Sequence, residues 1–126
     1  MGFTKIKVSV GQMEQKNGSH LFKKIKDAEV LVDTGATYST LPADLLKNCG
    51  ISSERDVSLR LADGRIVKRP IGYVWMEVEG VRIHTPCLFG ESNDPNLLGV
   101  IALEDANLSV DPVTRQLLKG TSYIQY

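Results

Sequence analysis

The stretch Val30-Leu31-Val32-Asp33-Thr34-Gly35-Ala36-Thr37 places an acidic residue directly after three apolar ones. An apolar run of this kind is typical of a strand that is covered on both faces, and Gly35 is expected to end it. A carboxylate at such a position is costly to bury unless it is paired or hydrogen-bonded. The stretch therefore marks Asp33 as a candidate functional acid, and the rest of the chain is interpreted around it.

The composition excludes several classes of protein. The chain has 126 residues, of which 42% are apolar and 24% are charged, as expected for a single domain spanning residues 1–126. Fifteen basic and fifteen acidic residues cancel, so we expect no nucleic-acid partner. No apolar run reaches the roughly 20 residues of a membrane-spanning helix, and the N-terminus lacks the apolar core of a signal peptide. We therefore expect a cytoplasmic protein without a membrane partner.

Cysteine and histidine are too sparse to predict a metal site. Cys49 and Cys87 form no Cys-x-x-Cys pair, and His20 and His84 stand apart from them. A zinc site needs about four well-spaced ligands. We interpret both thiols as reduced and structural, and we expect neither a metal nor a cofactor.

Alternating apolar and polar residues predict a mostly β chain. The pattern indicates strands over residues 6–10, 22–32, 57–61, 65–67, 72–78, 81–89, 108–110 and 115–119, with a final edge strand over 121–126. The polar segment Gly11 to Ser19 is interpreted as a loop or hairpin end. Tight turns are predicted at Asp63-Gly64 and at Glu79-Gly80.

Two short helices are expected between these strands. The first covers residues 40–50, where Pro42 fits the first turn and Gly50 fits a left-handed stop. The second covers Val100 to Asn107 and follows Leu97-Leu98-Gly99. Two copies of strand, glycine turn and helix also suggest a weak internal repeat, and with it a pseudo-symmetric barrel.

The order of these parts resembles the retroviral-type (retropepsin-like) aspartic proteases, most closely the small single-domain members found in bacteria and archaea. Val32-Asp33-Thr34-Gly35-Ala36 resembles their Asp-Thr/Ser-Gly-Ala signature. The hairpin tip Ala62-Asp63-Gly64-Arg65 lies where the family has its flap, and Leu97-Leu98-Gly99 resembles the family's hydrophobic-hydrophobic-Gly motif. The resemblance covers about residues 5–118 and implies an all-β fold, a closed acid-protease-like barrel with one or two short helices.

The resemblance also implies an aspartic endopeptidase that acts on a peptide or protein substrate. Such enzymes use two carboxylates that share one proton, because two like charges a few ångströms apart cannot both ionise. The ionised carboxylate takes a proton from water, and the protonated one hydrogen-bonds the scissile carbonyl. The chain carries one such motif, so the site requires a two-fold homodimer with one Asp33 from each chain.

The neighbours of Asp33 acquire roles by the same resemblance. The Thr34 hydroxyl reaches across to the partner's loop, and Gly35 permits the tight turn and the approach of the substrate backbone. Ala36 borders the cleft, where pepsin-type lobes often have a hydroxyl residue that supports the aspartate. The sequence therefore predicts a dyad that works closer to neutral pH than that of pepsin. The residues that we expect to line an apolar cleft are Ala36, Ile66, Val67 and Leu98.

The chain departs from the family pattern at two positions that matter for the dimer. Retroviral enzymes usually carry an Asp and an Arg, which pair with each other, where this chain has Thr37 and Val100. Both partners are absent together, so no buried charge loses its partner. The dimer must then be held in another way, and the candidates are the strand Phe3 to Val10 and the terminal segment Tyr123 to Tyr126.

The flap departs from the pattern as well, and two alternatives stay open. The tip carries one glycine, Gly64, where viral flaps have several. One alternative is therefore a non-catalytic retropepsin-like module for dimerisation or peptide binding. A weaker alternative is a metalloprotein built on Asp33, Asp63 and His84, which lack the spacing of a ligand set.

Overall fold

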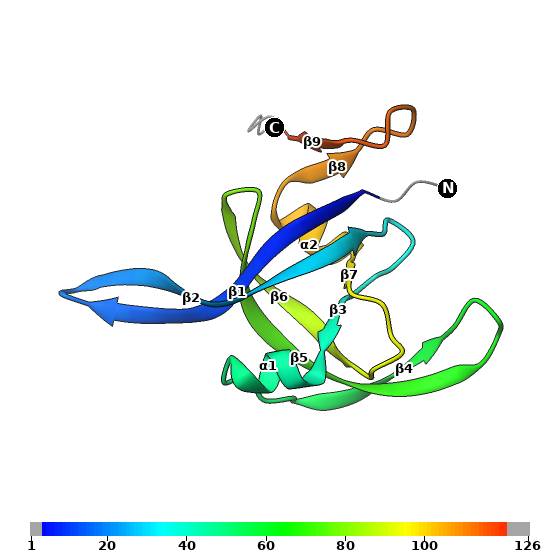
Figure 1. Ribbon diagram of the computed structural model, residues 1–126, viewed down its shortest axis with the longest axis horizontal. Helices are drawn as coiled ribbons and strands as arrows, with labels where there is room; N and C mark the ends of the chain where they lie inside the picture. Colours follow the sequence, from blue (N-terminus) through cyan, green and yellow to red (C-terminus); the bar gives the residue numbers. More distant parts are fainter. Residues whose placement is uncertain (1–3, 121–126) are drawn as a thin grey trace, which may run out of the picture.

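The structure is a computed structural model that describes residues 4–120, and Figure 1 shows their strands curled into one body with short helices packed beside them. In chain order the elements are β1 (Lys5–Lys16), β2 (Ser19–Val32), β3 (Ser39–Pro42), α1 (Ala43–Asn48), β4 (Arg55–Arg60), β5 (Ile66–Val78), β6 (Val81–Gly90), β7 (Leu97–Leu98), α2 (Val100–Asp105), β8 (Leu108–Val110) and β9 (Leu117–Lys119). The predicted all-β class with two short helices is confirmed.

The largest sheet closes on itself. Its strand order is β1-β2-β7-β3-β6-β5-β4, and β1 also pairs with β5 along Val8–Gly11, so six of the strands form a ring. β4 lies outside this ring and pairs with the first part of β5. The closed ring agrees with the barrel that the sequence predicts. The described segment ends in a small separate sheet of β8 and β9.

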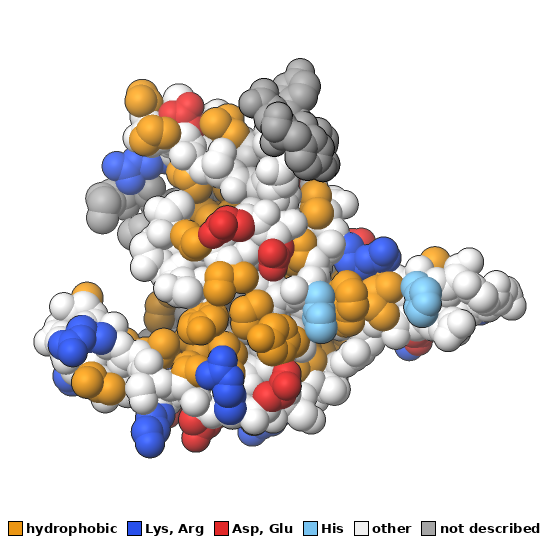
Figure 2. Space-filling model, turned by 180° about the vertical axis from the view of Figure 1, so that it is seen from behind, with side chains coloured by type: hydrophobic (Ala, Val, Ile, Leu, Met, Phe, Trp, Pro, Cys, Tyr) orange, Lys and Arg blue, Asp and Glu red, His pale blue; other side chains and the backbone are white. Residues whose placement is uncertain are grey.

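The core fills the inside of the ring, because side chains of a strand point alternately to its two faces. The largest side chains that are fully buried come from different elements and include Leu41, Leu46, Met76 and Leu98. Burying one such side chain stabilises the fold by about 1.5–3 kcal/mol. Hydrophobic side chains also gather on the outer surface that is seen from behind (Figure 2).

The long β1–β2 hairpin, which projects from the body in Figure 1, corrects one prediction. The segment Gly11–Lys16 is not a loop, because it continues β1 against β2 after a register shift between Val10 and Gly11. The predicted hairpin end is confirmed, but it is limited to the turn at Asn17-Gly18. A Cβ atom at Gly11 would lie 1.9 Å from the carbonyl oxygen of Lys23, so glycine allows the close approach at this bulge. The polar composition is misleading here because most of the projecting residues are exposed.

A second hairpin, formed by β4 and the first part of β5, makes an arm that also projects from the body (Figure 1). The predicted strands over residues 65–67 and 72–78 are one continuous strand, β5. Residues Ile66–Pro70 pair with β4, and β6 joins from Ile71 onward. Pro70 therefore lies in a segment of β5 that pairs with β4 alone, where its missing N–H is tolerated.

Two further predictions concern the ends of the chain and membranes. The predicted edge strand over residues 121–126 lies outside the described residues. Within residues 4–120, no helix has both the length and the apolar character that crossing a membrane requires.

Candidate active site

Asp33 directly follows β2 and lies beside the Leu97-Leu98-Gly99 motif. β2 pairs in parallel with β7, so that Leu31 faces Leu97 and Val32 faces Leu98. The Asp33 amide donates a 3.0 Å hydrogen bond to the Leu98 carbonyl oxygen. The two segments of the weak internal repeat therefore lie side by side at one point of the ring.

The loop after Asp33 holds the carboxylate in a defined orientation. The Gly35 amide donates to Asp33 Oδ1 at 2.9 Å, and the Ala36 amide donates to the Asp33 carbonyl oxygen at 3.2 Å. Side chains of this type commonly accept hydrogen bonds from amides two residues later in turns. Asp33 and Ala36 are half-buried, whereas Thr34 and Gly35 are exposed. The loop therefore presents the acid and its neighbours toward open space.

Thr37 and Val100, where the chain departs from the retroviral pattern, lie in two segments that are joined by backbone hydrogen bonds. The Val100 amide donates to the Ala36 carbonyl oxygen at 2.8 Å, and the Ile101 amide donates to the Thr37 carbonyl oxygen at 3.2 Å. These bonds use amides at the start of α2, which have no partner within their own helix. Main-chain hydrogen bonds thus attach the Asp33 loop to α2 in a chain that lacks the ion pair.

Gly99 fits tightly against the same loop. Its amide donates to the Oγ of Ser39 at 3.0 Å, and Ser39 is fully buried. A Cβ atom at Gly99 would lie 2.5 Å from the carbonyl oxygen of Tyr38 and 2.9 Å from that of Ala36. A side chain at this position would therefore displace backbone close to Asp33.

A cleft of about 890 Å³ lies between the Asp33 loop, the β4–β5 arm and the segment before β7. The arm contributes apolar residues to its wall, among them Leu59, Leu61, Ala62 and Val67. Leu59 and Val67 are cross-strand partners, so their side chains stand on the same face of the arm. The acid and an apolar wall thus border one cleft.

The structure corrects half of the predicted cleft lining. Ala36 and Val67 border the cleft, but Ile66 and Leu98 are not among the described residues that form it. Ile66 is 64% exposed because it precedes Val67 and points to the opposite face of the strand. Leu98 is fully buried in the core, and its neighbour Leu97 borders the cleft.

The predicted flap tip is a tight turn. Gly64 has a φ of 89°, and the Asp63 carboxylate accepts hydrogen bonds from the Arg65 amide at 3.0 Å and from its Nε at 2.7 Å. These two hydrogen bonds hold the pKa of Asp63 below its usual value, and the bond from the Arg65 amide has the larger effect. Both side chains are exposed. Asp63 and Arg65 therefore shape the turn, while Ala62 is the tip residue that reaches the cleft.

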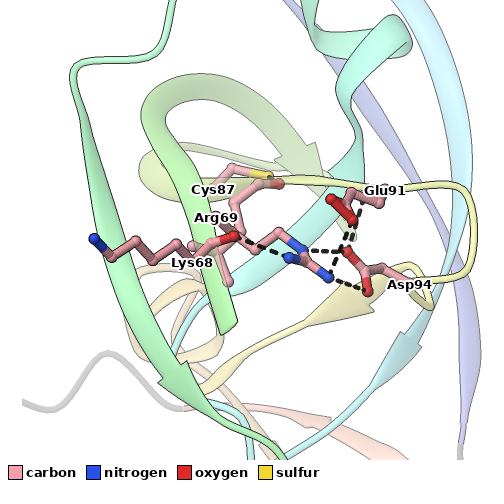
Figure 3. Close-up of polar contacts among 6 residues, drawn as sticks. Lys68, Arg69, Cys87, Glu91 and Asp94 are labelled. Atoms are coloured by element: carbon pink, nitrogen blue, oxygen red, sulfur yellow. Dashed lines mark hydrogen bonds and ion pairs between the residues drawn. The ribbon is translucent and has the colours of Figure 1, made fainter. Parts of the chain in front are cut away.

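The sequence did not single out Arg69 and Asp94, which also border the cleft. Figure 3 shows the guanidinium of Arg69 facing the Asp94 carboxylate, with Glu91 beside it. Arg69 Nε lies 2.7 Å from Asp94 Oδ2, and this contact lowers the pKa of Asp94 and raises that of Arg69. No local pattern in the sequence predicts the pair, because the chain must fold before the two residues meet.

The metal alternative finds no support in the described residues. Asp63 is paired with Arg65, and His84 stacks on Trp75 with ring centroids 4.4 Å apart. Across residues 4–120, no group of three or more His, Cys, Asp or Glu side chains could hold a metal ion. Cys49 and Cys87 are free thiols, and both are buried.

Comparisons with solved structures bear on the fold of the chain. Among solved structures, the EIAV protease complexed with the inhibitor HBY-793 matches with a TM-score of 0.55 and 21% identity, over 82% of this chain and 88% of that one. The solution structure of the Simian Foamy Virus (mac) protease matches with a TM-score of 0.51 and 16% identity, over 82% and 91%. A search of curated proteins returned no match. The two viral structures confirm the retropepsin-like fold.

The family assignment rests on the sequence itself. The model of a family described as gag-polyprotein putative aspartyl protease matches residues 24–105, which is more than half of the chain. The matched segment contains Asp33, the β4–β5 arm and Leu97-Leu98-Gly99. The chain therefore belongs to this family of retropepsin-like aspartyl proteases.

Proposed function

We propose that this protein is an aspartic endopeptidase whose active site forms between two copies of the chain. The observation that carries the proposal is the position of Asp33, which borders a cleft of about 890 Å³ with its carboxylate oriented by the Gly35 amide. Thr34 and Gly35 are exposed beside it. A second copy can therefore approach the loop along a two-fold axis, which places each residue opposite itself.

In the proposed mechanism, two Asp33 carboxylates share one proton and hold a water molecule between them. The ionised carboxylate takes a proton from the water while the water oxygen attacks the carbonyl carbon of the peptide bond. The protonated carboxylate hydrogen-bonds the carbonyl oxygen, and a proton passes to the nitrogen as the carbon–nitrogen bond breaks. The products are a carboxylic acid and an amine, and no metal or cofactor takes part.

The proposed flap is the β4–β5 arm around Gly64. Leu59 and Val67 lie on its cleft-facing side, where they would contact apolar side chains of a bound peptide. Beyond Gly64 and its two chain neighbours, no atom lies within 4 Å of the position that a Cβ on Gly64 would take, so the tip has open space in that direction. Closure of such an arm over a peptide would exclude water from the reaction.

The structure narrows the proposed dimer contacts at the start of the chain. Val8–Val10 already pair with β2 on one side and with β5 on the other, so this part of the predicted strand cannot pair with a partner copy. Lys5–Lys7 pair only with β2 among the described residues, and they lie closer to the chain end. Tyr123–Tyr126, the other candidate segment, lies outside the described residues.

Cleavage of a peptide library between about pH 4 and pH 7 tests the activity. We expect Asp33→Asn to lower the rate by about a hundredfold to ten-thousandfold, because the general base is lost. A statine peptide, which mimics the tetrahedral intermediate, should inhibit the wild type. The matched control is Asp44→Asn, which alters an acid in the first turn of α1 and should leave cleavage unchanged. A dimer that binds peptides but cleaves none would favour the non-catalytic binding module instead.

Mixing the wild type with Asp33→Asn tests whether the site is shared between two chains. Random exchange at equal amounts puts half of the wild-type chains into mixed dimers, so activity should fall to about half if both carboxylates are required. Unchanged activity after exchange would show that one chain suffices. Measuring the mass in solution across the same concentrations shows whether activity follows the dimer.

A further inference from the structure

Arg69 and Asp94 make a two-point contact between different walls of the cleft (Figure 3). Arg69 Nε donates to Asp94 Oδ2 at 2.7 Å, and Nη2 donates to Oδ1 at 3.2 Å. Paired hydrogen bonds between a guanidinium and a carboxylate are stronger and more directional than a single contact between charges. The pair therefore fixes both the distance and the relative orientation of the segments that carry it.

Each side chain is also held by its own segment. Asp94 Oδ2 accepts the Glu91 amide at 2.8 Å, and the Asp94 amide donates to the Glu91 carbonyl oxygen at 2.9 Å. Arg69 Nη1 donates to the Lys68 carbonyl oxygen at 2.9 Å. The side chains are only 14% and 23% exposed, so water screens their attraction less than it would at the surface. The Asp94 carboxylate thus organises its loop and binds it to β5.

The two segments have different attachments to the rest of the fold. Arg69 lies in the part of β5 that pairs with β4 and not with the ring, so it belongs to the arm. Asp94 lies in the loop 91–96, which leads into β7 and so toward the motif beside Asp33. The ion pair is therefore a direct link between the arm and the loop on the opposite wall.

We propose that Arg69 and Asp94 are positioning residues that set the width of the cleft and make the arm and the loop 91–96 move as one unit. This inference rests on the proposed function, since a peptide would occupy that cleft. In this proposal neither side chain takes part in the reaction itself, although both border the same cleft as Asp33. They act by fixing the two walls between which a peptide would lie.

Arg65 and Asp63 provide a matched control within the same arm. Their contact is also 2.7 Å long, but it joins two residues of one turn, and both side chains are more than half exposed. Removing this pair changes a charge at the tip without disconnecting the arm from any other segment. Arg65→Met and Arg69→Met are therefore the same chemical change, but only Arg69→Met removes the link between the arm and the loop 91–96.

Amide hydrogen exchange tests the link without requiring activity. In Arg69→Met we expect the amides of the loop 91–96 and of the arm to exchange about tenfold faster together, because one contact stabilises both. Asp94→Asn should produce the same pattern while keeping an oxygen for the Glu91 amide, and Arg65→Met should leave the loop unchanged. Faster exchange in the arm alone, or no change in either segment, would overturn the proposal.

Peptide cleavage then tests the effect on substrate. We expect Arg69→Met to raise KM about tenfold with a much smaller change in kcat and with the pH profile of kcat unchanged. Arg69→Lys should recover part of the loss, and combining Arg69→Met with Asp94→Asn should cost no more than either change alone. A loss confined to kcat would contradict a positioning role. If the wild type cleaves no peptide, the proposed function fails, but the exchange experiment still decides whether the link exists.

Discussion

The backbone amide of Asp33 lies 3.0 Å from the carbonyl oxygen of Leu98, and this hydrogen bond joins two glycine-containing motifs that are far apart in the sequence. Beside it, Val32 pairs in parallel with Leu98. The place of the candidate catalytic acid is therefore set jointly by both motifs. Substitutions in Leu97-Leu98-Gly99 should therefore change the position of Asp33, although they alter no residue of the Asp33 loop.

Gly99→Ala should damage both stability and activity. The added Cβ would lie 2.5 Å from the Tyr38 carbonyl oxygen, so backbone beside the Asp33 loop must move. Overpacking of this kind costs about 1–3 kcal/mol, which urea unfolding at fixed protein concentration would measure. Peptide cleavage should fall as well, because the Asp33 loop is displaced.

Gly18→Ala is the matched control for that substitution. Gly18 lies at the turn of the β1–β2 hairpin, with open space where a Cβ would stand but a φ of 80°. Its cost should be about 1 kcal/mol, from backbone strain alone, and cleavage should be unaffected. A Gly99→Ala protein that cleaves peptides like the wild type would show that this close contact does not hold the Asp33 loop.

Ser39→Ala should destabilise the fold by removing a single buried acceptor. The Ser39 Oγ accepts the Gly99 amide at 3.0 Å, and no water can replace it without entering the core. Leaving a buried N–H without a partner costs about 1–3 kcal/mol. The control is Ser9→Ala, whose hydroxyl donates to the exposed Asp27 carboxylate, where water can take its place. If urea unfolding showed that Ser39→Ala and Ser9→Ala lower the free energy of unfolding equally, this explanation would be wrong.

The Arg69–Asp94 pair predicts how stability depends on pH. Hydrogen bonds from Arg69, more than any other contact, hold the pKa of Asp94 below its usual value of 3.8, so the folded state binds that proton less tightly than the unfolded state. The stabilisation is therefore complete above this value and is lost as the pH falls through the lower folded pKa. Near pH 6, Asp94→Asn should lower the free energy of unfolding by about 1–3 kcal/mol.

Unfolding curves at a series of pH values test this prediction. The difference between the wild type and Asp94→Asn should shrink as the pH is lowered below 3.8. Asp63→Asn is the control, because Asp63 also has a lowered pKa but forms an exposed ion pair that solvent screens. A difference for Asp94→Asn that stays constant into acid would rule out the ion pair as its cause.

Both thiols should be inert in the folded protein. Burial raises the pKa of Cys87 to about 12 and also raises that of Cys49. At pH 8 only about one Cys87 side chain in ten thousand would then be a thiolate, the form that reacts. We expect a thiol reagent to label neither cysteine until the chain unfolds, so labelling can report unfolding. Rapid labelling of either thiol under native conditions would contradict the burial of that side chain.

Much of the local structure follows from the sequence, because strand alternation and turn residues act over a few positions. The turns at Asp63-Gly64 and Glu79-Gly80 form where their residues predict them, with positive φ at both glycines. The first helix also forms, but it is limited to Ala43–Asn48, because the residues before it, which were predicted to start the helix, form the strand β3 (Ser39–Pro42). Its stop at Gly50 has a φ of 77°, a conformation that glycine adopts without the usual cost.

Two kinds of prediction from the sequence were wrong. One concerned a segment whose exposed side chains do not alternate between apolar and polar, and the other concerned which face of a strand meets the cleft. Gly11–Lys16 resembles a loop because its side chains pack little against the core, yet its backbone pairs with β2. Ile66 and Leu98 are as apolar as the residues that border the cleft. Which side of each strand meets the cleft depends on the pairing of strands distant in the sequence.

By itself, the sequence determined that an acid stands at the end of a buried strand, followed by a glycine turn, in a chain with the order of parts of an aspartyl protease. These properties are local, since they depend on residue types and spacing. Only the tertiary structure decided what surrounds that acid. The parallel pairing of Val32 with Leu98 and the contact of Arg69 with Asp94 join residues that meet only when the ring of strands closes.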